Sequence, residues 1–197
     1  MIGDDVVDLG DPDAGRMHPR FDRRVFHPDE RALMARSVEP GRIRWLLWAL
    51  KESAYKAARK DDPATVFSPV RFVVRVEDDA SAIVRVGARR FRAAVSAGDG
   101  YVHAVARQAG DAPAFTETAV ARLAPGEESP HAAVRRLVRE RLAPVFGVAP
   151  ADLAVHREGR IPVLWLHGQR SDADLSLSHH GRFVSFACRL CPHHGSS

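Results

Sequence analysis

The stretch RIRWLLWALKESAYKAARK, residues 42–60, decides how this chain is organised. It contains no glycine or proline, it follows Pro40 and Gly41, and it ends at the breaker sequence DDPA. An uninterrupted run of good helix formers predicts one long helix. Glu52 and Lys56 lie four residues apart and therefore share one face of that helix. Such a pair is common surface decoration, so its spacing alone indicates no function.

Segments around this helix alternate apolar and polar residues between turn signals, which predicts antiparallel strands. A shorter helix is expected to begin near Pro28, because proline suits a first helical turn. The strands expected in this part of the chain cover residues 2–9, 66–79, 81–100 and 101–108.

The rest of the chain repeats the same order of strand, helix and hairpins. Ser129 is a suitable N-cap for a second helix, with Pro130 in its first turn. The expected elements are a strand at 115–123, a helix at 129–147, strands within 153–168, and a final hairpin at 174–190. We therefore expect an α+β fold of two similar halves, residues 1–110 and 111–197, each a small antiparallel sheet packed with a long helix.

Composition narrows the classes of protein to consider. The chain has 197 residues, of which 45% are hydrophobic and 27% charged, which indicates a globular protein. No run approaches the ~20 apolar residues that span a bilayer, and the N-terminus lacks a basic, apolar leader, so we expect a cytoplasmic protein. The formal charge of +4 favours an acidic partner, which leaves nucleic acid, a phosphorylated cofactor and an acidic protein open.

The two cysteines, Cys188 and Cys191, exclude a disulfide scaffold. With His193 and His194 they form CRLCPHH, which matches zinc-finger spacing poorly. A frayed tail is the better interpretation of this end.

Two further groups of residues could carry chemistry. Asp4, Asp5 and Asp8 supply the oxygen ligands that magnesium prefers, although a solvated acidic turn would look the same. Ser178 and His179 stand in the last hairpin, where a hydroxyl and an imidazole could bind phosphate or serve only the turn. The absence of a Gly-x-Ser-x-Gly sequence argues against a serine hydrolase.

Together these separately weak patterns match three motifs of one family. IGDDVVDL, residues 2–9, resembles the opening Gly-x-Asp-Ile/Val-Val-Glu motif of the phosphopantetheinyl transferases. WALKESAYKA, residues 48–57, resembles their Trp-x-x-Lys-Glu-Ala/Ser-x-x-Lys motif, and LSLSHHGRFVSFA, residues 175–187, resembles their Ser-x-Ser-His hairpin. EGRIPVL, residues 158–164, looks like their Gly-Lys-Pro segment with one inserted residue. The motif order is that of the short, trimeric class, while the length is that of the two-halved class, so the chain looks circularly permuted.

The resemblance implies a magnesium-dependent enzyme that moves phosphopantetheine from coenzyme A, its substrate, to a carrier-protein serine. It implies catalytic roles for Asp5, Glu52 and Lys56, with Asp5 and Glu52 as the metal ligands. Asp4 stands where the family usually has a small residue, and it either joins the metal shell or faces water. The expected coenzyme A contacts are Lys51, Arg160, Ser178 and His179.

The basic stretch before the long helix resembles a segment of the short class of phosphopantetheinyl transferases. In that class the segment faces an acidic helix of the carrier protein. Its arginines would give fast, salt-sensitive docking, or they form a solvated loop. They are Arg16, Arg20, Arg23 and Arg24. We expect a monomer that binds neither membrane nor nucleic acid. A non-catalytic coenzyme A or carrier-protein binder is the main rival, and a basic nucleic-acid-binding protein is a weaker one, because no nucleic-acid-binding signature occurs.

Overall fold

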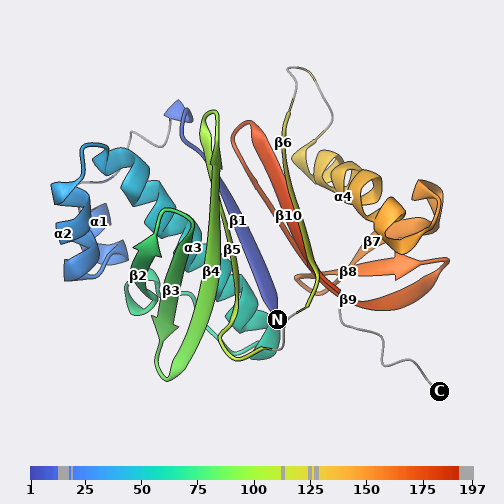
Figure 1. The fold of residues 1–197 in the computed structure, drawn as a ribbon, viewed down its shortest axis with the longest axis horizontal. Coiled ribbons are helices and arrows are strands. Elements are labelled where there is room, and N and C mark those ends of the chain that lie inside the picture. Colours follow the sequence, from blue (N-terminus) through green and yellow to red (C-terminus); the bar gives the residue numbers. More distant parts are fainter. Residues whose placement is uncertain (13–17, 19, 112–113, 124–125, 127–128, 191–197) are drawn as a thin grey trace.

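Two five-stranded antiparallel sheets lie side by side in the computed structural model, which describes residues 1–12, 18, 20–111, 114–123, 126 and 129–190 (Figure 1). The first sheet has the strand order β1-β5-β4-β3-β2. Its strands are β1 (Ile2–Asp8), β2 (Val73–Asp78), β3 (Ser81–Val86), β4 (Arg89–Gly98) and β5 (Tyr101–Gln108). The helices of this half are α1 (Phe21–Val25), α2 (Pro28–Arg36), α3 (Pro40–Asp61) and the 3₁₀ turn η2 (Pro69–Arg71).

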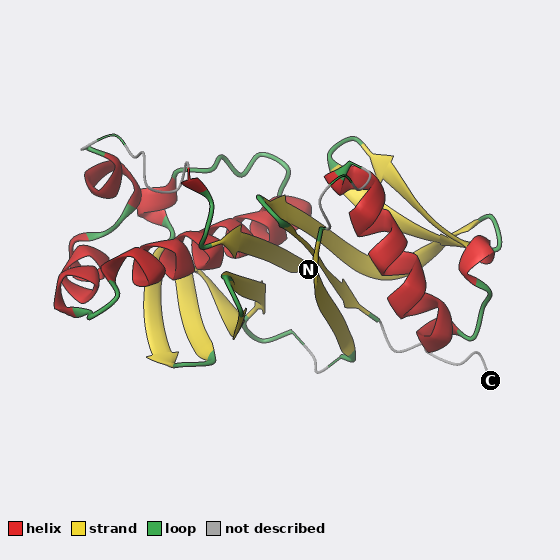
Figure 2. Ribbon diagram, turned by 90° about the horizontal axis from the view of Figure 1, so that it is seen from above, coloured by secondary structure: helices red, strands yellow, loops and turns green. Residues whose placement is uncertain are grey.

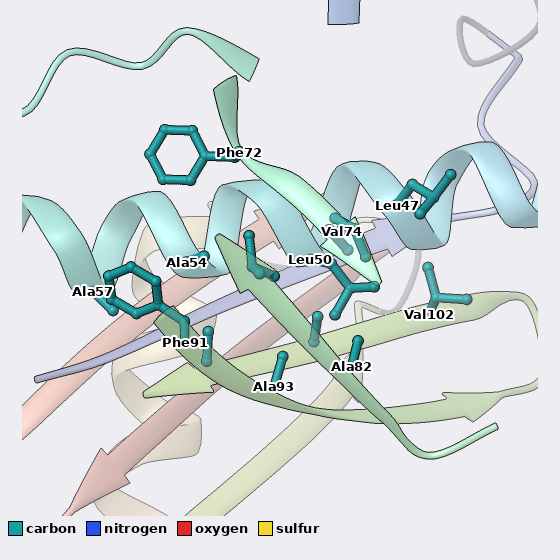
Figure 3. Close-up of a cluster of buried hydrophobic side chains, with 14 of the residues drawn as sticks. Leu47, Leu50, Ala54, Ala57, Phe72, Val74, Ala82, Phe91, Ala93 and Val102 are labelled. Carbon is teal, nitrogen blue, oxygen red and sulfur yellow. The ribbon is translucent and has the colours of Figure 1, made fainter. Parts of the chain in front are cut away.

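Helix α3 is the long helix that the sequence predicts, and it covers one face of the first sheet (Figure 3). Leu47, Leu50, Ala54 and Ala57 recur at spacings of three and four, so they form one apolar face. That face packs against strand residues such as Phe91, and all five side chains are buried. Burying one such leucine stabilises the fold by about 1.5–3 kcal/mol.

The second half repeats this plan with one helix on one face of its sheet (Figure 2). Its strand order is β6-β10-β9-β8-β7, which matches the first sheet position by position. Ser129 caps the helix through its hydroxyl, as predicted. The elements are β6 (Thr116–Arg122), α4 (Pro130–Phe146), the 3₁₀ turn η3 (Pro150–Asp152), β7 (Leu153–Glu158), β8 (Ile161–Leu166), β9 (Gln169–His180) and β10 (Phe183–Arg189). The expected α+β fold of two similar halves is thus confirmed.

Two local expectations were wrong. The strand expected from residue 66 begins only at Val73, because Pro69 starts the 3₁₀ turn η2 instead of an extended segment. The arginine-rich stretch before Pro28 contains the short helix α1, which the sequence did not indicate. Phe21 at the start of α1 packs against Trp45 and Trp48 of α3, so tertiary contacts hold this helix in place.

Candidate active site between the halves

The second half binds the first along one edge of β1. β5 occupies the other edge, so alternate N–H groups of β1 point outward, and side chains of β9 accept them. The pairs are Ile2 N with Asp174 Oδ2, Asp4 N with Ser176 Oγ (3.0 Å), Val6 N with Ser178 Oγ (3.3 Å) and Asp8 N with His180 Nδ1 (3.1 Å). Every second residue of β9 therefore satisfies a backbone donor that would otherwise be buried without a partner.

Asp5 lies at the centre of this junction. Its Oδ1 accepts hydrogen bonds from Lys56 Nζ on α3 and from Ser178 Oγ on β9, each at 2.9 Å. Lys56 Nζ also donates to the carbonyl oxygen of Asp4 at 2.8 Å and to Ser178 Oγ at 3.2 Å. The structure thus brings together Asp5, Lys56 and Ser178, which come from three different motifs.

Lys56 keeps its positive charge in this cluster. Burial disfavours the ammonium form, but the carboxylates of Asp5 and Asp4 outweigh burial and raise the pKa of Lys56. The ammonium group is therefore a fixed cation beside the Asp5 carboxylate at neutral pH.

Glu52 precedes Lys56 by one helical turn and lines the same cavity. Burial, and then the charge of Asp5, raise the pKa of Glu52 to about 7, although Lys56 opposes the shift. Within the described residues no side chain or backbone group donates a hydrogen bond to its carboxylate. Two carboxylates that repel each other in a partly buried site have the chemistry that a divalent cation relieves.

The protein alone supplies only part of a metal shell. Within the described ranges, no group of three or more His, Cys, Asp and Glu side chains is placed to hold a metal ion. Asp5 and Glu52 could therefore hold magnesium only if water and substrate oxygens complete its coordination, which is how magnesium is usually bound.

Gly3 sets the distance between β1 and α3. A Cβ atom on Gly3 would lie 2.1 Å from the carbonyl oxygen of Ser53, 2.6 Å from the backbone nitrogen of Ala57 and 2.9 Å from Cβ of Lys56. Only glycine allows this close approach. The glycine of the first motif thereby places Lys56 against Asp5.

Asp4 faces away from Asp5, because neighbouring strand residues point to opposite sides of a sheet. Its Oδ2 accepts from Ser185 Oγ at 2.6 Å and lies 3.3 Å from His103 Nε2, and the carboxylate is fully buried. Burial opposes the charge, but the bond from His103 and the charge of Lys56 lower the pKa of Asp4 overall. Asp4 therefore does not face water, which was one of its two alternatives. For the other alternative, a place in the metal shell, its carboxylate lies on the side of β1 opposite Glu52.

Two adjoining cavities of about 290 Å³ and 220 Å³ open beside the Asp5 cluster. Glu52 and Lys56 line the larger cavity, and His179 lines the smaller one. Arg157 and Arg160 line both, so the cavities form one basic cleft between α3 and the second half. Of these two arginines, sequence reasoning identified only Arg160. The alternation in HREGR could have indicated Arg157.

His179 points away from β1, on the α4 side of β9. Its ring contacts His131 of α4 in an edge-to-face arrangement, with 4.9 Å between centroids. Burial, and then the charges of His131 and Lys56, lower the pKa of His179. Sequence reasoning missed His131, because no local pattern links the first turn of α4 to the last hairpin.

Lys51 does not belong to this cluster. Its side chain is fully buried, and Nζ lies 2.8 Å from the Glu30 carboxylate, 3.1 Å from the Pro69 carbonyl oxygen and close to the Phe72 carbonyl oxygen. Lys51 therefore ties α2 and η2 to α3, and it lines neither cavity. A coenzyme A contact through its ammonium group does not fit this position.

The remaining sequence candidates lie at the periphery. Arg20, Arg23 and Arg24 are exposed on or beside α1, while Arg16 lies outside the described residues. Cys188 is buried in β10. Cys191, His193 and His194 also lie outside the described residues, so the structure does not test the interpretation of the tail. None of the helices among the described residues has the length and apolarity needed to cross a membrane.

Comparison with known proteins identifies a family. The family model of the 4′-phosphopantetheinyl transferase superfamily matches residues 1–106, which cover β1, α3 and most of β5. No curated protein matches the chain significantly.

Proposed function

This chain belongs to the 4′-phosphopantetheinyl transferase superfamily, and from this premise we propose that it transfers the 4′-phosphopantetheine group of coenzyme A to a serine of an apo acyl or peptidyl carrier protein. The products are the holo carrier protein and 3′,5′-ADP. One observation carries the proposal: Glu52 and Lys56 of the matched half border a cleft whose other wall carries Arg157 and Arg160, and Lys56 is hydrogen-bonded to Asp5 behind it.

The arginines of the cleft suit the phosphate groups of coenzyme A. A guanidinium donates two parallel hydrogen bonds to a phosphate and keeps its charge at any physiological pH. We assign Arg160 to these phosphates and add Arg157, because both border the same two cavities. His179 and His131 line the smaller cavity and contribute ring nitrogens as further hydrogen-bonding groups.

Asp5 and Glu52 are the residues that would hold magnesium. When bound, the ion neutralises charge on the pyrophosphate. Lys56 stabilises the same charge through its ammonium group. Ser178 contributes by holding the Asp5 carboxylate in place, since its hydroxyl donates to Asp5 Oδ1.

The reaction is a displacement at the β-phosphorus. The carrier serine oxygen forms a bond to that phosphorus, the bond to the bridging oxygen breaks, and 3′,5′-ADP leaves. A carboxylate of the cluster accepts the serine proton. The exposed Arg20, Arg23 and Arg24 are proposed to dock the acidic carrier protein. We also propose that the protein acts as a cytoplasmic monomer.

Release of 3′,5′-ADP tests this function. Coenzyme A, magnesium and apo carriers of the fatty-acid, polyketide and peptide type are incubated with the protein, and the nucleotide is separated by chromatography. We expect release only with magnesium and a carrier present, and a loss of at least 10²-fold in Glu52→Gln. Coenzyme A binding without release for any carrier would favour the non-catalytic binder instead.

A further inference from the structure

Three strands of each sheet correspond residue by residue through their registers, β1, β5 and β4 in the first sheet and β6, β10 and β9 in the second. In the first sheet Ile2 stands opposite Arg107, which stands opposite Arg92. In the second sheet Thr116 stands opposite Arg189, which stands opposite Asp174. Strand β6 is therefore the counterpart of β1. The counterparts of Asp174, Ser176, Ser178 and His180 are Arg92, Ala94, Ser96 and Gly98.

This correspondence identifies the outer edge of β6 as the counterpart of the β1 edge. The β1 edge is covered by β9 side chains that accept its N–H groups, and the β6 edge is not covered in this way. Leu123 N donates to Arg182 O at 2.7 Å, so by alternation the N–H groups of residues 116, 118, 120 and 122 point away from β10. Of the four facing β4 residues, an arginine, an alanine and a glycine have no side-chain acceptor, and only Ser96 carries a hydroxyl that can accept. Within the described residues these four N–H groups have no acceptor. A groove of about 500 Å³ separates Thr116 and Thr118 of β6 from the face of β4 and β5.

The wall of this groove carries two arginines, Arg92 and Arg107, and one carboxylate, Glu77. Arg92 stands directly opposite Arg107, and one row further along, outside the groove lining, Arg85 stands directly opposite Arg90. Like charges in directly opposed positions destabilise a sheet. In the described part of the chain none of the four has an ion-pair partner, and the nearby Glu77 is bound to Arg75.

We propose that this groove binds an extended acidic segment of a partner protein, which adds to the β6 edge as a further strand. Its backbone pairs with the outward N–H and C=O groups of β6. Its alternate side chains, about 6.7 Å apart, are Asp or Glu and meet Arg92 and Arg107. Its other side chains are small and apolar, to suit Ala94 and Val105. The proposal concerns a different face from the coenzyme A cleft and stands independently of the transfer reaction.

A protein segment fits this groove better than nucleic acid does. Single-stranded nucleic acids are held by aromatic side chains that stack on bases as well as by positive charge. Around its two arginines the groove is lined mainly by alanine, valine, serine and threonine side chains, together with Ile2, Glu77 and His103, and none of its lining residues in the described part of the chain is Phe, Tyr or Trp. A free strand edge, in contrast, is recognised specifically by another peptide backbone.

The test uses an acetylated and amidated nonapeptide of alternating Glu and Val, with hydrogen exchange and fluorescence anisotropy on the full chain. We expect slower exchange at Thr116, Thr118 and Val120. We also expect binding at least tenfold weaker for the Arg92→Ala/Arg107→Ala double variant. Arg139→Ala/Arg141→Ala on α4 removes the same charge elsewhere and should leave affinity within twofold.

Several outcomes overturn the proposal. These are equal affinity for a Lys-Val peptide, binding without protection of the β6 amides, or tighter binding of single-stranded RNA or anionic vesicles at the same salt concentration. Arg92→Glu provides a measurement that needs no ligand, because it replaces the repulsion with an opposite-charge pair to Arg107. We expect its Tm to rise by about 1–3 °C while peptide affinity falls. An unchanged or lower Tm would refute the argument from charge repulsion.

Discussion

The variant Gly3→Ala tests whether the close packing of β1 against α3 sets both the stability of the fold and the geometry of the candidate site. The added Cβ would lie 2.1 Å from a backbone oxygen of α3, whereas ordinary contact begins at 3.4 Å. Helix and strand must therefore move apart by about 1 Å, because neither backbone can rotate away. Overpacking of this kind costs about 1–3 kcal/mol, equivalent to a Tm lower by about 2–12 °C in a chain of this size. The same shift moves Lys56 away from Asp5, and a misplacement of about 1 Å can cost about 10²-fold in rate.

Thermal denaturation and the rate of 3′,5′-ADP release measure these two effects on the same samples. Gly41→Ala is the matched control, since no atom lies within 4 Å of the added carbon, in the first turn of the same helix. Its Tm should stay the same or rise slightly, because alanine is the better helix former. A Gly3→Ala protein with unchanged Tm and unchanged rate would refute the close-packing role of this glycine.

Three further predictions concern charged residues. Lys51→Met should lower the free energy of unfolding by about 3–5 kcal/mol, because it leaves the buried Glu30 carboxylate without its partner. A raised KM for coenzyme A at unchanged stability would instead show that Lys51 contacts coenzyme A. Arg182 holds the pKa of Asp8 well below its ordinary value of 3.8, so this carboxylate stabilises the fold above that pH and ceases to do so as the pH falls through the lowered pKa. Urea unfolding of Asp8→Asn should therefore show a deficit at pH 7 that narrows below pH ~4, and a deficit that does not change with pH would contradict this. Arg160→Ala should raise the Kd for coenzyme A about tenfold in calorimetry, whereas Arg170→Ala, outside the cleft, should not.

The architecture could be predicted from the sequence because local periodicities of apolar and polar residues mark most of its helices and strands. The run 42–60 predicted α3, and the alternation in residues 174–190 predicted the hairpin of β9 and β10. The start of β2 was misplaced because Pro69 lies within an apolar run that otherwise resembles a strand. Neither α1 nor the pairing of the two sheets has a local signal, since both depend on tertiary contacts.

The residues of the candidate active site could be predicted only where they belong to a family motif. Asp5, Lys56 and Ser178 do meet, although nothing in their spacing along the chain places them together. Lys51 was assigned to coenzyme A from its motif, but burial against the Glu30 carboxylate is a tertiary property that the motif does not reveal.

The mass of an apo carrier protein after incubation with coenzyme A and magnesium is the most direct test of the transferase assignment. The account predicts a gain equal to one phosphopantetheine arm on a serine for at least one carrier type. It also predicts that Asp5→Asn abolishes this gain while coenzyme A still binds. No gain on fatty-acid, polyketide or peptide carriers, or an undiminished gain with Asp5→Asn, would contradict the proposed cleft and its chemistry.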